Sequence, residues 1–311
     1  MEVVAFERRR IPEGAILSTW RAADGWAYRR MDWRQPRQAG ARGNLLFAGG
    51  RGDFIEKYLE ACGHWHARGW NVTMFDWRGQ GGSQEIVETQ LGSLDPLVDD
   101  LTALVADWRS ESAGPHVVVA HSMGGHILLR TLVEGEAQLD AAVLVAPMVM
   151  INARPLPRFA ASHIASFITG LGLGGRPAWK TPRRLMQTGS RRQAFLTSSP
   201  ERYEDEAWWW REHPGYHLGA PSWGWLRAAY RSSARLTPAS LSTIRIPLLF
   251  IAASHDRLVS SAAIRRAAAA VPGAELLIFE RAGHEILRES DPVRLEALAR
   301  IDSFLDQRAP A

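Results

Sequence analysis

The stretch that decides the fold is VVVAHSMGG, residues 117–125. Its first half is a short continuous apolar run, which is typical of a buried strand. The run breaks at Ser122, and apolar residues then return with helical spacing at Leu128, Leu129 and Leu132. This pattern predicts a strand, a sharp turn and a helix, with the serine at the turn. A serine in that position stands clear of the sheet on strained backbone, and both properties suit a nucleophile.

The serine turn departs from the pattern GxSxG at its first position, where Ala120 stands in place of glycine. Alanine is larger than glycine by one methyl group and is still small. A purely structural turn between a strand and a helix is the alternative interpretation at this point. The choice between the two depends on whether a base and an acid stand at suitable places elsewhere in the chain.

Two later strands are each followed by a residue that can complete a proton relay. Residues 247–253 form an apolar run that opens with proline and closes at a polar stretch containing Asp256. A second predicted strand, residues 275–280, ends shortly before His284. The order serine, aspartate, histidine, with each member in a loop at one edge of a parallel sheet, predicts a catalytic triad. The alternatives are that Asp256 caps the helix after it and that His284 is an ordinary loop histidine.

Acyl transfer also needs N–H donors that point at the developing oxyanion. An apolar strand at residues 44–48 leads into GGRGD, residues 49–53, whose glycines let the backbone approach a ligand closely. We expect the backbone N–H groups of Arg51 and Met123 to form the oxyanion hole and Gly50 to contact the substrate. The alternative is a turn whose aspartate caps the next helix. A nucleotide-binding loop is disfavoured, because the segment lacks both the P-loop lysine and the third glycine of a dinucleotide fingerprint.

Five pieces of the chain together resemble the monoacylglycerol lipase and bacterial lysophospholipase branch of the α/β-hydrolase superfamily. They are FAGGRG (residues 47–52), DWRGQGGS (76–83), AHSMGG (120–125), Asp256 and GHE (283–285). The resemblance covers nearly the whole chain. It implies the α/β-hydrolase fold, which is a mostly parallel sheet flanked by helices with an inserted helical cap. It also implies the triad Ser122, Asp256 and His284.

The same resemblance separates structural residues from catalytic ones. In that branch the DxRGxGxS loop is a structural turn, so Asp76 and Arg78 are not expected to take part in the reaction. The branch usually carries histidine where Gly49 stands and glycine where Ala120 stands. These departures affect the expected substrate more than the expected mechanism.

The arrangement of strand-like and helical stretches predicts where the cap is inserted. The two alternate on either side of residues 151–240, which favours a mostly parallel sheet. Residues 1–35 mix short alternating runs with turns, which is typical of antiparallel strands at a sheet edge. We therefore predict a core made of residues 1–150 and 241–311, with residues 151–240 inserted between them as the cap.

The predicted cap has an unusual composition. It carries 13 Lys and Arg against 5 Asp and Glu and holds six of the 13 tryptophans, although the whole chain has a net charge of only +4. We expect tryptophans of the cap to line an apolar acyl-chain pocket. Among them, Trp208 and Trp223 are predicted to contact the substrate. The helical stretch 159–171 could line an acyl tunnel or lie on lipid. The basic segment 176–192 accompanies these aromatic residues, and it fits either a solvated rim or the surface of an anionic membrane. As a hypothesis, the cap docks transiently on anionic lipid.

Composition also disfavours several classes of protein. No run of about 18 apolar residues is present to cross a bilayer, and the first ten residues lack the apolar stretch of a signal peptide. Cys62 is the only cysteine, so no intrachain disulfide can form, and a cytoplasmic location with peripheral membrane contact is expected. Cys62, His64 and His66 would diverge on a helix, so they are not expected to bind a metal. No other cofactor is expected. Nucleic acid is disfavoured as a partner because no recognition motif accompanies the basic charge.

The residues thus predict a serine hydrolase that works through an acyl-enzyme, and the resemblance implies carboxylic esters of lipid-like substrates, lysophospholipid or monoacylglycerol. His121 is a rival base, but its place on the strand beside the nucleophile is expected to point it elsewhere. His126 is expected to make a packing or polar contact. A carboxylesterase, thioesterase or perhydrolase acting on small acyl substrates would use the same triad. A non-catalytic ligand-binding protein of the same fold is the alternative outside enzymology.

Overall fold

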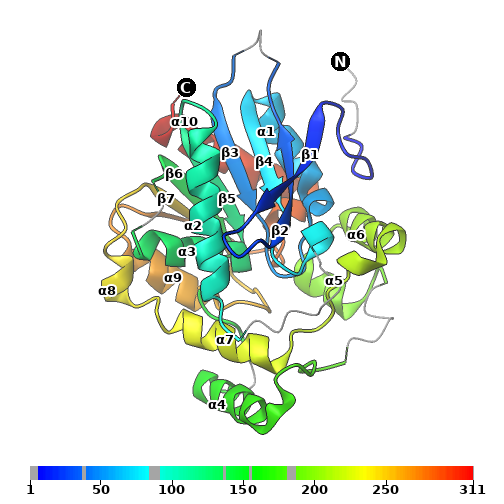
Figure 1. Cartoon of the computed structure of the whole chain (residues 1–311), viewed down its shortest axis with the longest axis vertical. Coiled ribbons are helices and arrows are strands. Elements are labelled where there is room, and N and C mark those ends of the chain that lie inside the picture. The colour runs from blue at the N-terminus through cyan, green and yellow to red at the C-terminus, as the bar shows by residue number, and fades with distance from the viewer. Residues whose placement is uncertain are drawn as a thin grey trace.

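A single eight-stranded sheet forms the centre of the molecule (Figure 1). The computed structural model describes residues 6–36, 40–83, 92–135, 138–153, 156–180 and 187–310. The strands are β1 (Ala15–Arg21), β2 (Ala27–Trp33), β3 (Gly43–Ala48), β4 (Trp70–Phe75), β5 (His116–His121), β6 (Ala141–Val145), β7 (Leu248–Ala253) and β8 (Glu275–Phe279). Their order across the sheet is β1-β2-β4-β3-β5-β6-β7-β8. β2 is antiparallel to both of its neighbours and all other pairs are parallel, which confirms the predicted sheet and its antiparallel edge.

Helices flank the sheet and continue beyond one end of it. The helices that follow core strands are α1 (Leu59–Ala67), α2 (Asp95–Ser110), α3 (Met123–Val133), α9 (Ser261–Ala270) and α10 (Asp291–Arg308). The others are α4 (Arg158–Ile168), α5 (Arg191–Leu196), α6 (Pro200–Glu212), α7 (Trp223–Ser233) and α8 (Pro238–Leu241). Short helical turns are η1 (Ile55–Tyr58), η2 (Gly81–Ser83), η3 (Thr169–Leu173), η5 (Pro214–Tyr216) and η6 (Ile286–Arg288). Across the described ranges, none of the helices combines the length and the apolar character needed to cross a bilayer.

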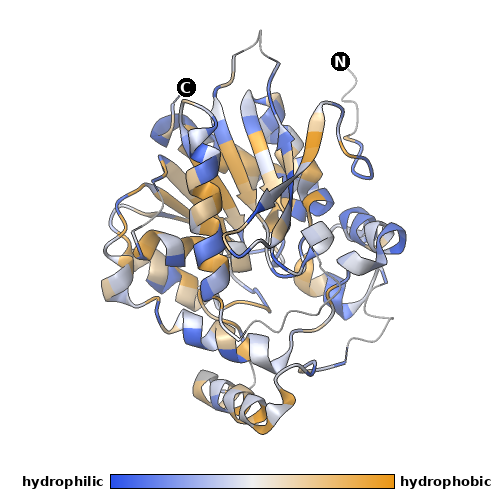
Figure 2. Ribbon diagram, viewed as in Figure 1, coloured by the Kyte–Doolittle hydropathy of each residue, from blue (hydrophilic) through white to orange (hydrophobic). Residues whose placement is uncertain are grey.

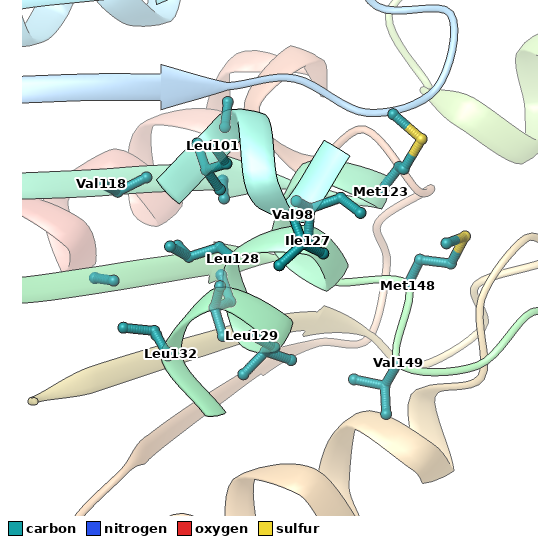
Figure 3. Close-up of a cluster of buried hydrophobic side chains, with 14 of the residues drawn as sticks. Val98, Leu101, Val118, Met123, Ile127, Leu128, Leu129, Leu132, Met148 and Val149 are labelled. Atoms are coloured by element: carbon teal, nitrogen blue, oxygen red, sulfur yellow. The ribbon is translucent and has the colours of Figure 1, made fainter. Parts of the chain in front are cut away.

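The central strands are buried on both faces, as their continuous apolar runs predict. In β5, Val117 and Val119 face the layer that contains α1 and α10. Val118 and Ala120 face the opposite layer, with α2, α3 and α9. Figure 3 shows this second layer, where Ile127 and its neighbours on α3 pack beside β5. Figure 2 shows that apolar residues concentrate in the strands, while the helices place polar residues outward. The sheet is therefore held rigidly between two apolar layers.

Residues 151–240 supply α4 to α7, which lie at the end of the sheet toward which the parallel strands point (Figure 1). α7 packs on both sides: Ala228 and Ala229 join the core layer of α3, while Leu226 contacts Ala165 of α4. α4 continues directly into the π-helical turn η3, so the two together cover the whole helical stretch 159–171 that the sequence predicts. We propose that this segment is the cap, with the boundaries that the sequence predicts.

Candidate active site

Ser122 stands at the turn between β5 and α3, with strained backbone angles of φ 51° and ψ −113°. The small residues after it are required by close packing. A Cβ atom on Gly124 would lie 2.4 Å from the carbonyl oxygen of Ala48, and one on Gly125 would lie 2.9 Å from the Cβ of Pro147. The helix can start at this point only because neither residue has a side chain.

His284 connects the serine to an acid. Its Nε2 lies 2.8 Å from the Oγ of Ser122, and its Nδ1 lies 2.6 Å from Oδ2 of Asp256. The other carboxylate oxygen of Asp256 accepts hydrogen bonds from the backbone N–H groups of Leu258 and Val259, at 2.7 and 3.0 Å. These bonds fix the carboxylate in the loop after β7, and the cap of α9 is a serine instead. The three side chains predicted from sequence therefore meet in one hydrogen-bonded series.

Burial and charge have opposite effects on the pKa values of His284 and Asp256. Burial alone would lower the pKa of the His284 imidazole, but the charge and hydrogen bond of Asp256 outweigh it and leave the pKa raised. Burial would raise the pKa of Asp256, but His284 and the two backbone N–H groups lower it overall. Asp256 is therefore ionised at neutral pH, and it stabilises the positive charge that forms when the imidazole accepts a proton.

The glycine-rich turn after β3 borders Ser122. A Cβ atom on Gly50 would lie 2.9 Å from the Cβ of Ser122, so the close approach requires glycine. The N–H of Gly50 donates to Asp53 at 2.6 Å, and this aspartate does not cap the helical turn that follows it. Within the part of the chain that the structure describes, the N–H groups of Arg51 and Met123 have no hydrogen-bond acceptor. Both remain available for an oxyanion, and their assignment as the oxyanion hole stays a prediction.

A cavity of about 900 Å³ opens beside Ser122 and His284. Among the described residues, its tryptophans are Trp179, Trp210 and Trp225. Its remaining apolar lining includes Met148, Ile151, Phe195, Leu196, Leu218, Leu226, Leu258 and Val259. The lining also carries polar and charged side chains, and a hollow of this size that combines aromatic and aliphatic surface with polar groups is suited to a small organic ligand.

The structure differs from the sequence-based choice of tryptophans. Trp208 packs in a cluster with Phe54 and Trp209, and Trp223 packs in the layer between α7 and α4. Neither lines the cavity. Each residue of a helix is rotated by about 100° from the one before it, so Trp208 and Trp210, which are two residues apart, point to nearly opposite sides of α6. The sequence shows where tryptophans are concentrated, but it does not show which of them face the cavity.

His121 is engaged away from the serine, as expected. Its Nδ1 lies 2.8 Å from Asp53 Oδ2 and 2.9 Å from the hydroxyl of Tyr58. Its Nε2 lies 3.4 Å from the backbone carbonyl oxygen of His284. The imidazole thus links the glycine-rich turn to the loop that carries His284.

Asp53, which contacts this imidazole, belongs to a group of buried ionic side chains. This group is here named the buried charge cluster: Asp53, Lys57, Glu206, Glu285 and Arg288. The Nζ of Lys57 lies 2.7 Å from Asp53, 2.7 Å from Glu285 and 3.1 Å from Glu206. Arg288 pairs with both glutamates. Burial opposes ionisation of Glu206, but the nearby cations outweigh it and lower its pKa to about 2. The cluster joins α6 of the cap to the residue beside His284, and sequence reasoning missed it.

Other residues singled out in the sequence are structural. Asp76 accepts backbone N–H groups from two neighbouring segments, and Arg78 pairs with two carboxylates. His126 lies 2.7 Å from the hydroxyl of Ser232, and burial lowers the pKa of its imidazole to about 3. Cys62 is fully buried in the layer of α1. These groups hold the elements that position the site.

Known proteins share both the sequence and the architecture. A family model described as serine aminopeptidase, S33, matches residues 39–291. The probable lysophospholipase L2 of Haemophilus influenzae is 28% identical over 289 residues, covering 90% of this chain and 88% of its own. Lysophospholipase L2 of Escherichia coli is 29% identical over 283 residues, covering 85% and 80%.

Solved structures are similar at lower sequence identity. A soluble variant of monoglyceride lipase from Saccharomyces cerevisiae superposes with a TM-score of 0.73 at 17% identity, over 97% of this chain and 99% of the other. A carboxyl esterase from Bacillus coagulans has a TM-score of 0.73 at 16% identity, over 96% and 100%. At such identities the likeness establishes the fold, while the family match spans most of the sequence. The chain therefore belongs to the serine aminopeptidase S33 family, in the lysophospholipase and monoacylglycerol lipase-like branch of the α/β-hydrolase superfamily.

Proposed function

We propose that this protein is a serine hydrolase that cleaves carboxylic esters of lipid-like substrates, lysophospholipid or monoacylglycerol, through an acyl-enzyme. The observation that carries the proposal is the unbroken hydrogen-bonded series from Asp256 through His284 to Ser122 at the edge of an apolar cavity. The names of the relatives, lysophospholipase and monoglyceride lipase, support the lipid class. The tryptophans and aliphatic residues of the lining support binding of an acyl chain.

In the proposed mechanism, the Oγ of Ser122 attacks the ester carbonyl carbon while Nε2 of His284 takes the hydroxyl proton. The backbone N–H groups of Arg51 and Met123 donate to the oxyanion of the tetrahedral intermediate. Collapse breaks the ester bond, and the imidazolium returns its proton to the leaving alcohol oxygen. Water then attacks the acyl-enzyme with His284 again as base, which releases the fatty acid and restores the serine.

The proposal is tested by hydrolysis assays on p-nitrophenyl esters, monoacylglycerols and lysophospholipids. We expect the wild-type protein to hydrolyse at least one lipid of these classes and the Ser122→Ala variant to lose roughly 10⁴-fold or more of the rate. Circular dichroism checks that the variant stays folded. Retained activity in the variant would overturn the assignment of the nucleophile, and no hydrolysis of any ester by the wild-type protein would favour the non-catalytic alternative.

We also propose that the outer face of the cap contacts an anionic membrane. Phe159, Phe167 and Leu171 on α4 and η3 are exposed by 69%, 68% and 60%, although such side chains are usually buried. This exposure supports contact with lipid over an internal acyl tunnel. Arg176 and Lys180 follow closely and are also exposed, whereas Arg183 and Arg184 lie outside the described residues. In this proposal the protein is cytoplasmic and meets the membrane at this surface.

Sedimentation with liposomes tests the membrane contact. We expect binding to vesicles that contain anionic lipid, weakened by salt and by the double substitution Phe159→Ser and Phe167→Ser. The matched control is Leu295→Ser, at an exposed apolar residue of α10 on the core. Binding that does not depend on anionic lipid, on salt or on the two phenylalanines would contradict the proposal.

A further inference from the structure

Arg51 presents a guanidinium without a carboxylate to the active-site cavity. Its Nη1 donates to the backbone carbonyl oxygen of Gly219 at 3.0 Å, and its Cζ lies 5.2 Å from the ring centre of Trp225. Over the described ranges, no Asp or Glu oxygen lies within ion-pair distance of it. A guanidinium has five N–H donors, and within the described part of the chain one of them is satisfied, by the carbonyl oxygen of Gly219.

The other arginines that are largely withdrawn from solvent around the site are paired. They are Arg29 with Glu56 and Asp76, Arg78 with Asp24 and Asp100, Arg192 with Glu206, Arg202 with Glu60 and Asp291, and Arg288 with Glu206 and Glu285. Pairing raises the pKa of each of these guanidinium groups despite burial. Burial instead lowers the pKa of Arg51 to about 10. Arg51 is half-buried and lines the cavity, and a partly desolvated cation with no carboxylate partner among the described residues is suited to bind an anionic group of a ligand.

The surroundings of Arg51 show where that anion would lie. Arg51 lines the same cavity as Ser122 and His284. The described lining contains five Lys and Arg residues against two carboxylates, Asp53 and Glu285. Both carboxylates are already bound by the ammonium of Lys57 in the buried charge cluster. Lys57 and Arg192 are themselves paired with carboxylates, so the described lining keeps Arg51, Arg191 and Arg257 as cations without an ion pair.

We propose that the guanidinium of Arg51 binds the phosphate of a lysophospholipid substrate and so selects phosphate-bearing monoacyl esters over uncharged ones. This inference rests on the proposed function. The backbone N–H of Arg51 is proposed to hold the ester carbonyl oxygen, and the short glycerol unit of a lysophospholipid joins that ester to the phosphate. One residue can thus contact both groups of the same molecule. The planar fork of a guanidinium also matches two phosphate oxygens, which an ammonium does not.

The test compares kcat/KM for a lysophosphatidylcholine with kcat/KM for a monoacylglycerol of the same acyl chain. In the wild-type protein we expect this ratio to favour the lysophospholipid. Arg51→Met removes the guanidinium and keeps the backbone N–H, so the ratio should fall about tenfold to a hundredfold. Arg51→Lys keeps the charge without the fork and should give an intermediate ratio. Arg266→Met, at an exposed residue of α9 outside the cavity, is the matched control and should leave the ratio unchanged.

Several outcomes distinguish this inference from the proposed function. An unchanged ratio in Arg51→Met, with both lipids still hydrolysed, would overturn the inference alone. Hydrolysis of neither lipid by the wild-type protein would overturn the proposed function and the inference together. If Arg51→Met does not fold, Arg51→Lys and the wild-type ratio decide the matter, because a wild-type preference for monoacylglycerol contradicts the inference. Inhibition by inorganic phosphate that is equal in wild type and Arg51→Lys would also count against a guanidinium site.

Discussion

Lys57 and Arg51 are six residues apart in the sequence and lie in two regions that hold charge in opposite ways. In the buried charge cluster, Lys57 contacts three carboxylates and is 9% exposed. In the cavity, Arg51 contacts a carbonyl oxygen and an aromatic ring. The paired cation holds the cap to the core beneath His284. The cation of Arg51, which has no carboxylate partner among the described residues, is available to a ligand, and it lines the same cavity as Ser122 and His284.

The largest expected effect concerns His284, which lines the cavity with Arg51. His284→Ala removes the base that activates Ser122, and we expect kcat/KM for a p-nitrophenyl ester to fall about 10⁴-fold or more. The free energy of unfolding, measured by chemical denaturation, should stay close to that of the wild-type protein. A loss below tenfold in folded His284→Ala protein would show that another residue is the base.

Removing the paired cation should mainly affect stability. Lys57→Met leaves three buried carboxylates without their shared partner, so we expect the free energy of unfolding to fall by about 3–5 kcal/mol. Denaturation in urea provides the measurement. The selectivity between lysophospholipid and monoacylglycerol should stay close to that of the wild type in folded protein. A change in selectivity without a change in stability would reverse the roles assigned to the two regions.

The pH dependence of activity reports the charge balance around His284. The imidazole must be neutral to accept the serine proton, and its pKa is raised above its ordinary value of 6.5 because Asp256 outweighs burial. kcat/KM should therefore fall about tenfold for each pH unit below this raised pKa, with the midpoint above pH 6.5. Rates on a soluble ester between about pH 5 and about pH 9 measure this pH dependence. A midpoint below 6.5 would mean that burial dominates.

The smallest effect is expected for stability when the unpaired cation is removed. Arg51→Met loses one hydrogen bond and one aromatic contact but also removes a half-buried charge that has no carboxylate partner among the described residues, so the free energy of unfolding should change by no more than about 1 kcal/mol. Urea denaturation alongside Lys57→Met gives the direct comparison. A loss as large as that of Lys57→Met would indicate that Arg51 is a structural residue.

Much of this arrangement could be predicted from the sequence because local patterns determine it. The apolar runs predicted the parallel strands, and the residues just past three strand ends predicted the positions of Ser122, Asp256 and His284. Parallel strands place their carboxyl ends at one edge, so separate loops were expected to meet. The glycine-rich turn could also be recognised from a local pattern, because GGRGD directly follows an apolar run.

The remainder depends on contacts that local patterns do not determine. Lys57 and Glu206 are distant in the sequence, and nothing in either segment indicates that they pair. The orientation of α6 decides that Trp210 and not Trp208 lines the cavity. The environment of the Arg51 side chain likewise depends on the cap, which brings Gly219 and Trp225 against it. Substrate selection therefore depends on the part of the molecule that the sequence specifies least directly.

Covalent labelling with a fluorophosphonate, mapped by mass spectrometry, tests the central claim that His284 and Asp256 make Ser122 a nucleophile. We predict one modified residue, Ser122, in the folded wild-type protein, and labelling that is strongly slowed in His284→Ala and absent after denaturation. Modification of another residue while Ser122 stays free, or equal labelling rates in the wild-type protein and His284→Ala, would contradict the account.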